Sequence, residues 1–270
     1  MQKAVLITGS SSGIGLCAAN TLKQRGYRVL AACRKPADLA EMARLGFEPV
    51  ELDLDCPQSV ARAAEQVLAL TDNRLYGLFN NAGFGLYGPL DTVSREDLEK
   101  QFSANLFGTH QLTTLLLPAM KQAGEGRIIQ TSSVMGLIST PGRGAYAASK
   151  YALEAWSDAL RMELSGSGIR VSLIEPGPIT TRFTENVTQT MQDKPVKNPG
   201  IASLFTGKPE DVVKKVIHAL EHPHPKIRYP VTGLTVIVMW LRRLLPLWLM
   251  DKNTEQKIRR RLKCRAAPRC

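Results

Sequence analysis

The stretch Lys3-Ala-Val-Leu-Ile-Thr-Gly-Ser-Ser-Ser-Gly-Ile-Gly15 joins a short apolar run to a turn of glycine and serine. Residues 3–8 are small, apolar and β-branched, which is typical of a buried strand. Residues 16–25 then show helical periodicity, so the turn connects a strand to a helix. At such a junction, backbone N–H groups point at an anion and glycines allow close approach of a diphosphate. The stretch therefore predicts the first βα unit of an α/β sheet.

The glycines at positions 9, 13 and 15 have the spacing Gly-x-x-x-Gly-x-Gly, which differs from the common dinucleotide fingerprint. An ordinary loop is the alternative interpretation, but a second strand at residues 27–33 favours a phosphate-binding βαβ unit. In such units an acidic residue at the end of the second strand selects NAD. Cys33 occupies that position here, followed by Arg34 and Lys35. The two cations could meet a 2′-phosphate, so NADP(H) is the predicted cofactor unless they are solvated loop charges.

Two further predicted strands end in residues that can approach the same ligand. Residues 47–52 form a third strand that ends at Asp53, whose carboxylate could accept a hydrogen bond from an adenine amino group. A loop or helix-capping role for Asp53 is the alternative, because an amphipathic helix follows at residues 57–70. Residues 75–79 form a fourth strand, which runs into the turn Asn80-Asn-Ala-Gly83.

A long helix is predicted from Ser94 to about residue 121, and a capping box with Asp97 marks its start. Asn105 lies in the middle of this helix, although Asn is a poor helix former. The side chain is either exposed, as such residues usually are, or it orders a water molecule.

The fifth predicted strand, residues 126–131, delivers Ser133, and a predicted helix at residues 144–164 carries Tyr146 and Lys150. Residues four positions apart share one face of a helix. Free tyrosine has a pKa of about 10, and a nearby cation stabilises the phenolate and lowers that value. The pattern therefore predicts a proton-donating phenol beside an ammonium group, with the serine returned to it by a loop. Ordinary surface positions for the tyrosine and lysine are the alternative.

A sixth strand at residues 169–174 ends in the loop Pro176-Gly177, and residues 226–230 form a short seventh strand. Because open parallel sheets bind ligands at the carboxyl ends of their strands, the polar strand ends should converge on one cleft. The order of elements predicts an α/β fold, a Rossmann-type doubly wound parallel seven-stranded sheet with helices on both faces. We expect one catalytic domain over residues 1–230, with the irregular segment 182–207 as a substrate lid.

Charge and cysteine content limit the partners of this chain. The net charge is +11, but residues 251–270 contain eight Lys or Arg against two acidic residues, so +6 of it belongs to this tail. The remainder is only mildly basic, and no nucleic-acid partner is expected. Five cysteines without disulfide or metal-ligand spacing predict a reducing compartment and no metal site. The apolar strand starts at once, leaving no room for a signal peptide, so we expect a cytoplasmic protein.

Residues 231–270 form an amphipathic, basic C-terminal extension that we expect to be partly helical. Arg242, Arg243 and Pro246 interrupt its apolar run, which argues against a transmembrane span. Tryptophans and leucines followed by a cationic tail fit peripheral membrane contact through residues 233–265. Packing as a lid over the cleft, or against another subunit, is the alternative. Small residues along the helix of Tyr146 also suit subunit contact, and a homo-oligomer, dimer or tetramer, is expected.

In combination these motifs resemble those of the short-chain dehydrogenases/reductases over residues 1 to about 230. The residues that carry the resemblance are Thr8-Gly9-x-x-x-Gly13-x-Gly15, Asn80-Asn81-Ala82-Gly83, Asn105, Ser133, Tyr146-x-x-x-Lys150 and Pro176-Gly177. Within this family the chain is most similar to the YbbO-type bacterial NADP-dependent aldehyde reductases. It is also similar to the branch of retinol and 17β-hydroxysteroid dehydrogenases.

The resemblance implies that Tyr146 is the acid/base, Ser133 holds the carbonyl, Lys150 binds the nicotinamide ribose and Asn105 orders a relay water. The residues that it assigns to NADP(H) binding are Gly9, Ser11, Ser12, Gly13, Ile14, Gly15, Arg34, Lys35, Asp53, Leu54, Asn81, Ala82, Gly83, Tyr146, Lys150, Pro176, Gly177, Ile179 and Thr181. The implied reaction is NADPH-dependent reduction of a small apolar aldehyde, or another carbonyl, to an alcohol. The alternatives are a retinol or hydroxysteroid dehydrogenase, a 3-oxoacyl thioester reductase, and a catalytically silent NADPH-binding regulator.

Overall fold

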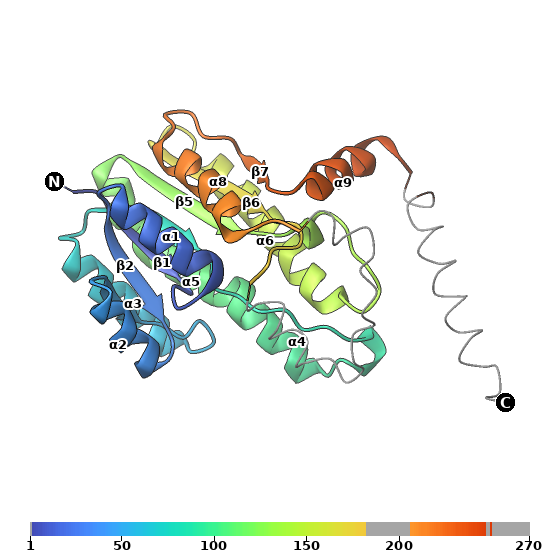
Figure 1. The fold of residues 1–270 in the computed structure, drawn as a ribbon, viewed down its shortest axis with the longest axis horizontal. Helices are drawn as coiled ribbons and strands as arrows, with labels where there is room; N and C mark the ends of the chain where they lie inside the picture. Colours follow the sequence, from blue (N-terminus) through green and yellow to red (C-terminus); the bar gives the residue numbers. More distant parts are fainter. Residues whose placement is uncertain (1, 182–205, 247–248, 250–270) are drawn as a thin grey trace.

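A single parallel sheet organises the molecule (Figure 1). The structure, a computed structural model, describes residues 2–181, 206–246 and 249. The strands are β1 (Ala4–Thr8), β2 (Arg28–Cys33), β3 (Glu48–Glu51), β4 (Leu75–Asn80), β5 (Gly126–Thr131), β6 (Ile169–Glu175) and β7 (Arg228–Pro230). They lie in the order β3-β2-β1-β4-β5-β6-β7 and every neighbouring pair is parallel. The predicted doubly wound, seven-stranded fold is therefore confirmed.

Helices cover both faces of this sheet. They are α1 (Gly13–Gln24), α2 (Pro36–Arg44), α3 (Pro57–Leu70), α4 (Arg95–Phe102), α5 (Gly108–Ala123), α6 (Gly144–Glu163), α8 (Pro209–Glu221) and α9 (Gly233–Leu244). Shorter elements are the 3-10 helices η1 (Leu90–Thr92) and η3 (Val134–Gly136) and the π-helix η2 (Ser103–Phe107). Buried side chains of α3, α5 and α6 pack on one face of the sheet, and those of α1, α2 and α8 pack on the other.

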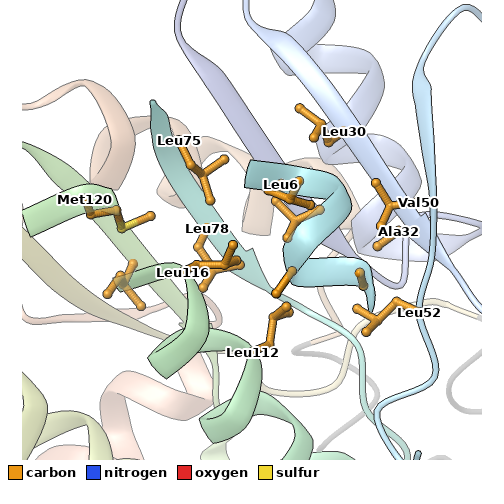
Figure 2. Packing of buried hydrophobic residues seen from close by; sticks show 14 of the residues in the cluster. Leu6, Leu30, Ala32, Val50, Leu52, Leu75, Leu78, Leu112, Leu116 and Met120 are labelled. Carbon is orange, nitrogen blue, oxygen red and sulfur yellow. The ribbon is translucent and has the colours of Figure 1, made fainter. Parts of the chain in front are cut away.

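The alternation of side chains along each strand feeds these two cores. Leu6 of β1 points into the first core, where Figure 2 shows it among leucines of β4 and α5, whereas its neighbours Val5 and Ile7 point into the second. All three side chains are completely buried. Burying a side chain of this size contributes roughly 1.5–3 kcal/mol, so β1 is held firmly from both sides. The turn that follows β1 therefore starts from a rigid base.

One helical prediction needs correction. α2 lies between the second and third strands, where the alternation of strands and helices implies a helix without giving its bounds. The single helix predicted from Ser94 to about residue 121 is wrong in its middle. It starts as expected, because Ser94 Oγ accepts a hydrogen bond from the backbone N–H of Asp97. The π-helix η2 then separates α4 from α5. Such a π-helical turn inserts an extra residue and is frequent at functional sites.

The C-terminal extension contains the helix α9, which begins three residues after β7. Among the residues that the structure describes, no helix combines the length and apolar character needed to cross a membrane. The lid predicted for residues 182–207 lies outside the described residues except for its last two, and the basic segment 251–270 lies entirely outside them.

Candidate active site

The turn between β1 and α1 is packed so tightly that it admits only glycine at two positions. A Cβ on Gly15 would lie 2.2 Å from the carbonyl oxygen of Gly9, and one on Gly9 would lie 3.0 Å from Cα of Ala82. The N-cap residue of α1, Ser12, makes no side-chain capping hydrogen bond, and the first turn carries no acidic residue. The N-terminus of α1 thus keeps its positive end available, which fits a diphosphate.

Thr8 fastens this turn to the loop after β4. Its buried hydroxyl accepts hydrogen bonds from the backbone N–H groups of Asn81 (3.0 Å) and Ala82 (2.9 Å). The Asn81 side chain returns a hydrogen bond to the carbonyl of Thr8 at 3.0 Å. Asn81 therefore joins the two loops through its side chain, and Thr8 is a positioning residue that the site prediction omits. Thr8 is the last residue of β1, next to the end of β4, and this position could have identified it from the sequence.

The end of β2 has the arrangement expected for a 2′-phosphate. Cys33 is buried, and burial raises the pKa of its thiol to about 11, with the nearby Asp38 adding to the effect. Arg34 and Lys35 follow on the surface, where both cations are exposed. Asp38 is a carboxylate at this corner that sequence reasoning missed, because it falls within α2, a helix whose bounds the sequence does not give. The strand end itself carries no acidic residue, which fits NADP(H) better than NAD(H).

The loop after β3 is more structural than predicted. The Asp53 carboxylate accepts a hydrogen bond from the backbone N–H of Asp55 at 3.1 Å, so it closes a local turn. Leu54 is buried, and its carbonyl oxygen would lie only 2.2 Å from a Cβ on Gly108, the first residue of α5. These contacts favour the loop role of Asp53 that the sequence left open.

Asn105 is buried at 1% exposure within the π-helix, which excludes the exposed position, one of the two alternatives that the sequence leaves open. Its side chain accepts a hydrogen bond from the N–H of Phe84 (3.1 Å) and donates to the carbonyl of Phe84 and to Ser149 Oγ (both 3.0 Å). A Cβ on Gly83 would lie 2.9 Å from Asn105 Oδ1 and 3.8 Å from Lys150 Nζ. The π-helix thus brings Asn105, Gly83 and Lys150 to one place.

Ser133 and Tyr146 meet although thirteen residues separate them in the chain. Ser133 caps η3 by accepting a hydrogen bond from the N–H of Met135 at 3.1 Å, and its hydroxyl lies close enough to Tyr146 to oppose in part the effect of burial on the pKa of that phenol. Lys150 lies one turn further along α6, with Nζ 5.8 Å from the centre of the Tyr146 ring. The same ammonium donates a hydrogen bond to the carbonyl of Thr131 at 2.7 Å. The three predicted side chains therefore share one site at the end of β5.

Burial dominates the proton affinities in this site. It raises the pKa of Tyr146 above its ordinary value, contrary to the expectation that Lys150 lowers it. It also lowers the pKa of Lys150 to about 8. Both shifts have the same cause, since removal from water disfavours the phenolate and the ammonium alike. A phenol with a raised pKa stays protonated at neutral pH and remains a possible proton donor.

Tyr146 belongs to an apolar cluster. Its members come from η3, α6, α9 and the loop after β4, and they are Tyr87, Val134, Met135, Ile138, Tyr146, Ala147, Leu234 and Val238. The rings of Tyr87 and Tyr146 are 5.8 Å apart, and the exposed Arg143 lies 5.1 Å from the Tyr87 ring. A depression of about 470 Å³ borders the first turn of α6, lined by Pro89, Leu90, Ser139, Thr140, Pro141, Gly142 and Gly144. The surroundings suit an uncharged substrate.

The loop after β6 closes the site from the other side. The carbonyl of Pro176 accepts a hydrogen bond from the N–H of Val134 at 2.8 Å, which ties this loop to Ser133. Ile179 pairs with Gly207, and a Cβ on Gly13 would lie 3.3 Å from the Thr181 side chain. Thr181 therefore stands over the glycine turn, so one loop contacts both the turn and the loop that carries Ser133.

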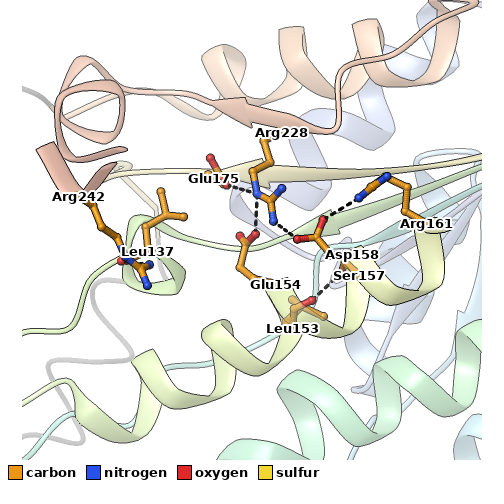
Figure 3. A network of polar contacts seen from close by, with 9 residues as sticks. All are labelled: Leu137, Leu153, Glu154, Ser157, Asp158, Arg161, Glu175, Arg228 and Arg242. Atoms are coloured by element: carbon orange, nitrogen blue, oxygen red, sulfur yellow. Dashed lines mark hydrogen bonds and ion pairs between the residues drawn. The ribbon is translucent and has the colours of Figure 1, made fainter. Parts of the chain in front are cut away.

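A buried ionic cluster supports α6 behind this site (Figure 3). Arg228 of β7 pairs with Glu154 of α6 (3.1 Å), Asp158 of α6 (2.5 Å) and Glu175 of β6 (3.3 Å). Glu175 is completely buried, and burial with the neighbouring carboxylates raises its pKa to about 7. Because Glu154 follows Lys150 by one helical turn, this ionic cluster fixes the helix that carries Tyr146. Sequence reasoning did not identify it.

Comparisons with known proteins extend over nearly the whole chain. A family model described as short chain dehydrogenase matches residues 3–192. The chain is 69% identical over 252 residues to uncharacterized oxidoreductase YbbO of Escherichia coli (strain K12), which covers 93% of this chain and 94% of that protein. It is 36% identical to human retinol dehydrogenase 5 over 276 residues, covering 92% of this chain and 86% of that protein. A solved structure of a short chain dehydrogenase from Burkholderia cenocepacia J2315 in complex with NADP has a TM-score of 0.78 and 25% identity, covering 94% of this chain and 99% of that chain. The range that the family model matches includes the glycine turn and Tyr146.

Proposed function

The chain belongs to the short-chain dehydrogenase family, and from this premise we propose that it reduces apolar aldehydes to alcohols with NADPH. Membership makes it an oxidoreductase; the cofactor preference and the substrate are the proposal. The observation that carries it is that the hydroxyls of Ser133 and Tyr146 lie near each other beside Lys150, with Tyr146 in an apolar cluster. Such a pair can bind a carbonyl oxygen with two donors, and the apolar side chains packed around Tyr146 favour an apolar substrate.

The glycine turn and the exposed Arg34 and Lys35 support NADPH as the cofactor. Gly9 and Gly15 pack too closely against their neighbours to carry a side chain, so the backbone at the start of α1 is bare where a diphosphate would bind. The two cations would hold the 2′-phosphate. NADP is present in the Burkholderia cenocepacia relative. The bound cofactor would supply the hydride, which is chemistry that no side chain of the protein can perform.

In the proposed mechanism the side chains bind the carbonyl and deliver a proton. Ser133 donates a hydrogen bond to the carbonyl oxygen and stabilises the charge that develops on it. Tyr146, which stays protonated because of its burial, gives its proton to that oxygen. Lys150 would hold the nicotinamide ribose, and Asn105 would order the water that returns the proton. Positioned donors and acids of this kind each contribute about 10²–10⁴ in rate.

Tyr146→Phe tests the central assignment. We expect NADPH-linked reduction of an apolar aldehyde to fall by about 10²- to 10⁴-fold, because the variant lacks the acid. Tyr151→Phe is the matched control, since Tyr151 lies on the same helix and its hydroxyl only donates to the carbonyl of Leu137 at 2.6 Å. NADPH consumption by the purified proteins is the measurement. Near-full activity in Tyr146→Phe would remove the tyrosine from the mechanism.

A second candidate is a retinol or hydroxysteroid dehydrogenase, which the 36% identity to human retinol dehydrogenase 5 favours. A panel of apolar aldehydes, retinal, ketosteroids and oxoacyl thioesters separates the candidates by kcat/KM. We expect the aldehydes to be the best substrates. Preference for retinal or a steroid would select the second candidate, and NADPH binding without turnover of any compound would indicate a silent regulator.

A further inference from the structure

The helix α9 covers the proposed active site with its inner face. Val238 is only 8% exposed and, with Leu234, belongs to the apolar cluster that contains Tyr146. Thr235, one turn from Val238, is completely buried. The helix therefore forms part of the wall around the catalytic hydroxyl pair and is not a free appendage.

Specific contacts hold α9 in this place. Thr232 caps its start by accepting a hydrogen bond from the N–H of Thr235, and Arg242 near its end donates to the carbonyl of Leu137 (Figure 3). The Arg242 guanidinium also lies 4.9 Å from the ring of Tyr151 on α6. Both ends of the helix are thus fastened, so the orientation of its other face is fixed as well.

The outer face of α9 is apolar and exposed. It consists of large side chains at helical spacing, namely Val236 (38% exposed), Ile237 (47%), Trp240 (54%), Leu241 (40%) and Leu244 (71%). Positions three and four apart share one side of a helix, so these five form one continuous stripe. Large contiguous apolar patches on a protein surface mark interaction sites. The stripe has no role in holding α9, because the inner face and Arg242 do that.

Charge and length indicate what covers this stripe. The segment that follows, residues 251–270, carries eight Lys or Arg against two acidic residues. An apolar helix face with an exposed tryptophan, followed in the sequence by a basic segment, is the pattern of binding to an anionic lipid surface. The twelve residues of α9 span about 18 Å, less than the roughly 30 Å of a bilayer core, which suits a helix lying in the interface.

We propose that the outer face of α9 docks on an anionic phospholipid bilayer, with residues 251–270 attracted to the lipid headgroups. Because the inner face of the same helix lines the cluster around Tyr146, docking places the proposed site beside the lipid phase. Apolar carbonyl compounds dissolved in the bilayer would then be its substrates. This last step rests on the proposed function, whereas the docking itself does not.

Vesicle flotation with the full chain tests the docking without any turnover. The probes are vesicles of phosphatidylcholine alone and vesicles that also contain phosphatidylglycerol. We expect binding to the second kind, weakened by salt, and at least a tenfold weaker binding of Ile237→Glu and Trp240→Glu. Ile227→Glu is the matched control, because Ile227 is exposed to a similar degree (44%) but precedes β7 and is not part of the outer face of α9. Reduction of a water-soluble aldehyde without vesicles should be equal in all four proteins.

Three other outcomes overturn the docking proposal. Absence of wild-type binding removes the bilayer as the occupant. Equal binding of wild type and both α9 variants would assign the attraction to the basic segment alone. A concentration-dependent dimer that the α9 variants abolish, without vesicle binding, would show that a second copy of the chain covers the stripe. If docking is shown but no carbonyl compound is reduced, the proposed function fails and the docking stands.

Discussion

The two halves of the sheet place their functional groups by different means. In the half formed by β1, β2 and β3, the site is made of backbone that approaches closely, as at Gly9 and Gly15 against their neighbours. In the half formed by β5, β6 and β7, it is made of side chains held by burial and charge, as in the Arg228 ionic cluster behind α6. The first half should therefore be sensitive to added volume, and the second to protonation.

Gly15→Ala should produce the largest effect in the first half. The added Cβ would lie 2.2 Å from a backbone oxygen and 2.8 Å from Asn81 Nδ2, and backbone cannot move aside as a side chain can. We expect a loss of about 1–3 kcal/mol of stability and a roughly 10- to 100-fold weaker affinity for NADPH. Isothermal titration and thermal unfolding measure the two quantities.

Gly88→Ala is the control, because its nearest contact would be the Thr92 side chain at 3.8 Å, an ordinary distance. It should bind NADPH as the wild type does. Wild-type affinity in Gly15→Ala would show that the turn can relax and that close packing does not decide cofactor binding.

Glu175→Gln should reveal the protonation dependence of the second half. Glu175 pairs with Arg228 at 3.3 Å but lies near Glu154 and Asp158, and its pKa is about 7. An unfolded glutamate has a pKa of about 4.3, so the folded state keeps a proton that the unfolded state has lost between these values. This contribution to stability is complete below about pH 4.3 and is lost as the pH rises to about 7.

The variant lacks this titration, so wild-type stability should fall relative to Glu175→Gln by roughly 1–3 kcal/mol as the pH rises from about 4.3 to 7. Denaturant unfolding at a series of pH values measures the difference. Glu163→Gln, an exposed replacement at the end of α6, is the control for the loss of one carboxylate from the surface. Parallel curves for wild type and Glu175→Gln would contradict the raised pKa.

Arg34→Ala should have the smallest effect, and it tests whether Arg34, at the end of β2, contacts the 2′-phosphate. Loss of one charge-assisted contact to a 2′-phosphate should reduce the preference for NADP over NAD, as a ratio of kcat/KM values, by about tenfold. Lys35 would retain part of the preference. Arg44→Ala is the matched control, since Arg44 is exposed on α2 and pairs with Glu41 at 2.7 Å. An unchanged ratio in Arg34→Ala would make Arg34 an ordinary surface charge.

The same contrast explains which features could be predicted from the sequence. The strands, the glycine turn and the helix of Tyr146 follow from local patterns, because strand ends in a parallel sheet meet at one edge whatever the loops contain. Ser133 could be placed for that reason. The Arg228 ionic cluster could not, since it joins Arg228 to carboxylates of α6 and β6 that precede it by more than fifty positions.

Asn105 and α9 show the other limit of sequence reasoning. Helix propensities apply to a regular α-helix and do not predict a π-helical turn. The sequence therefore leaves open whether Asn105 is exposed or orders a water molecule. The sequence predicts an amphipathic extension over residues 231–270, and the structure describes within it the helix α9, with one buried and one exposed apolar face. Which face of α9 packs on Tyr146 depends on the tertiary contacts of Val238 and Arg242. The spacing of apolar residues does not predict those contacts.

The π-helix at residues 103–107 also determines which side of the following helix, α5, faces the sheet. Each residue of an α-helix advances the side chains by about 100°, so deletion of one residue from this segment would rotate the whole of α5 by that angle. Leu112 and Leu116, both completely buried against the sheet, would then face away from it. Homologous chains should therefore vary in length at surface loops and keep this segment free of insertions and deletions.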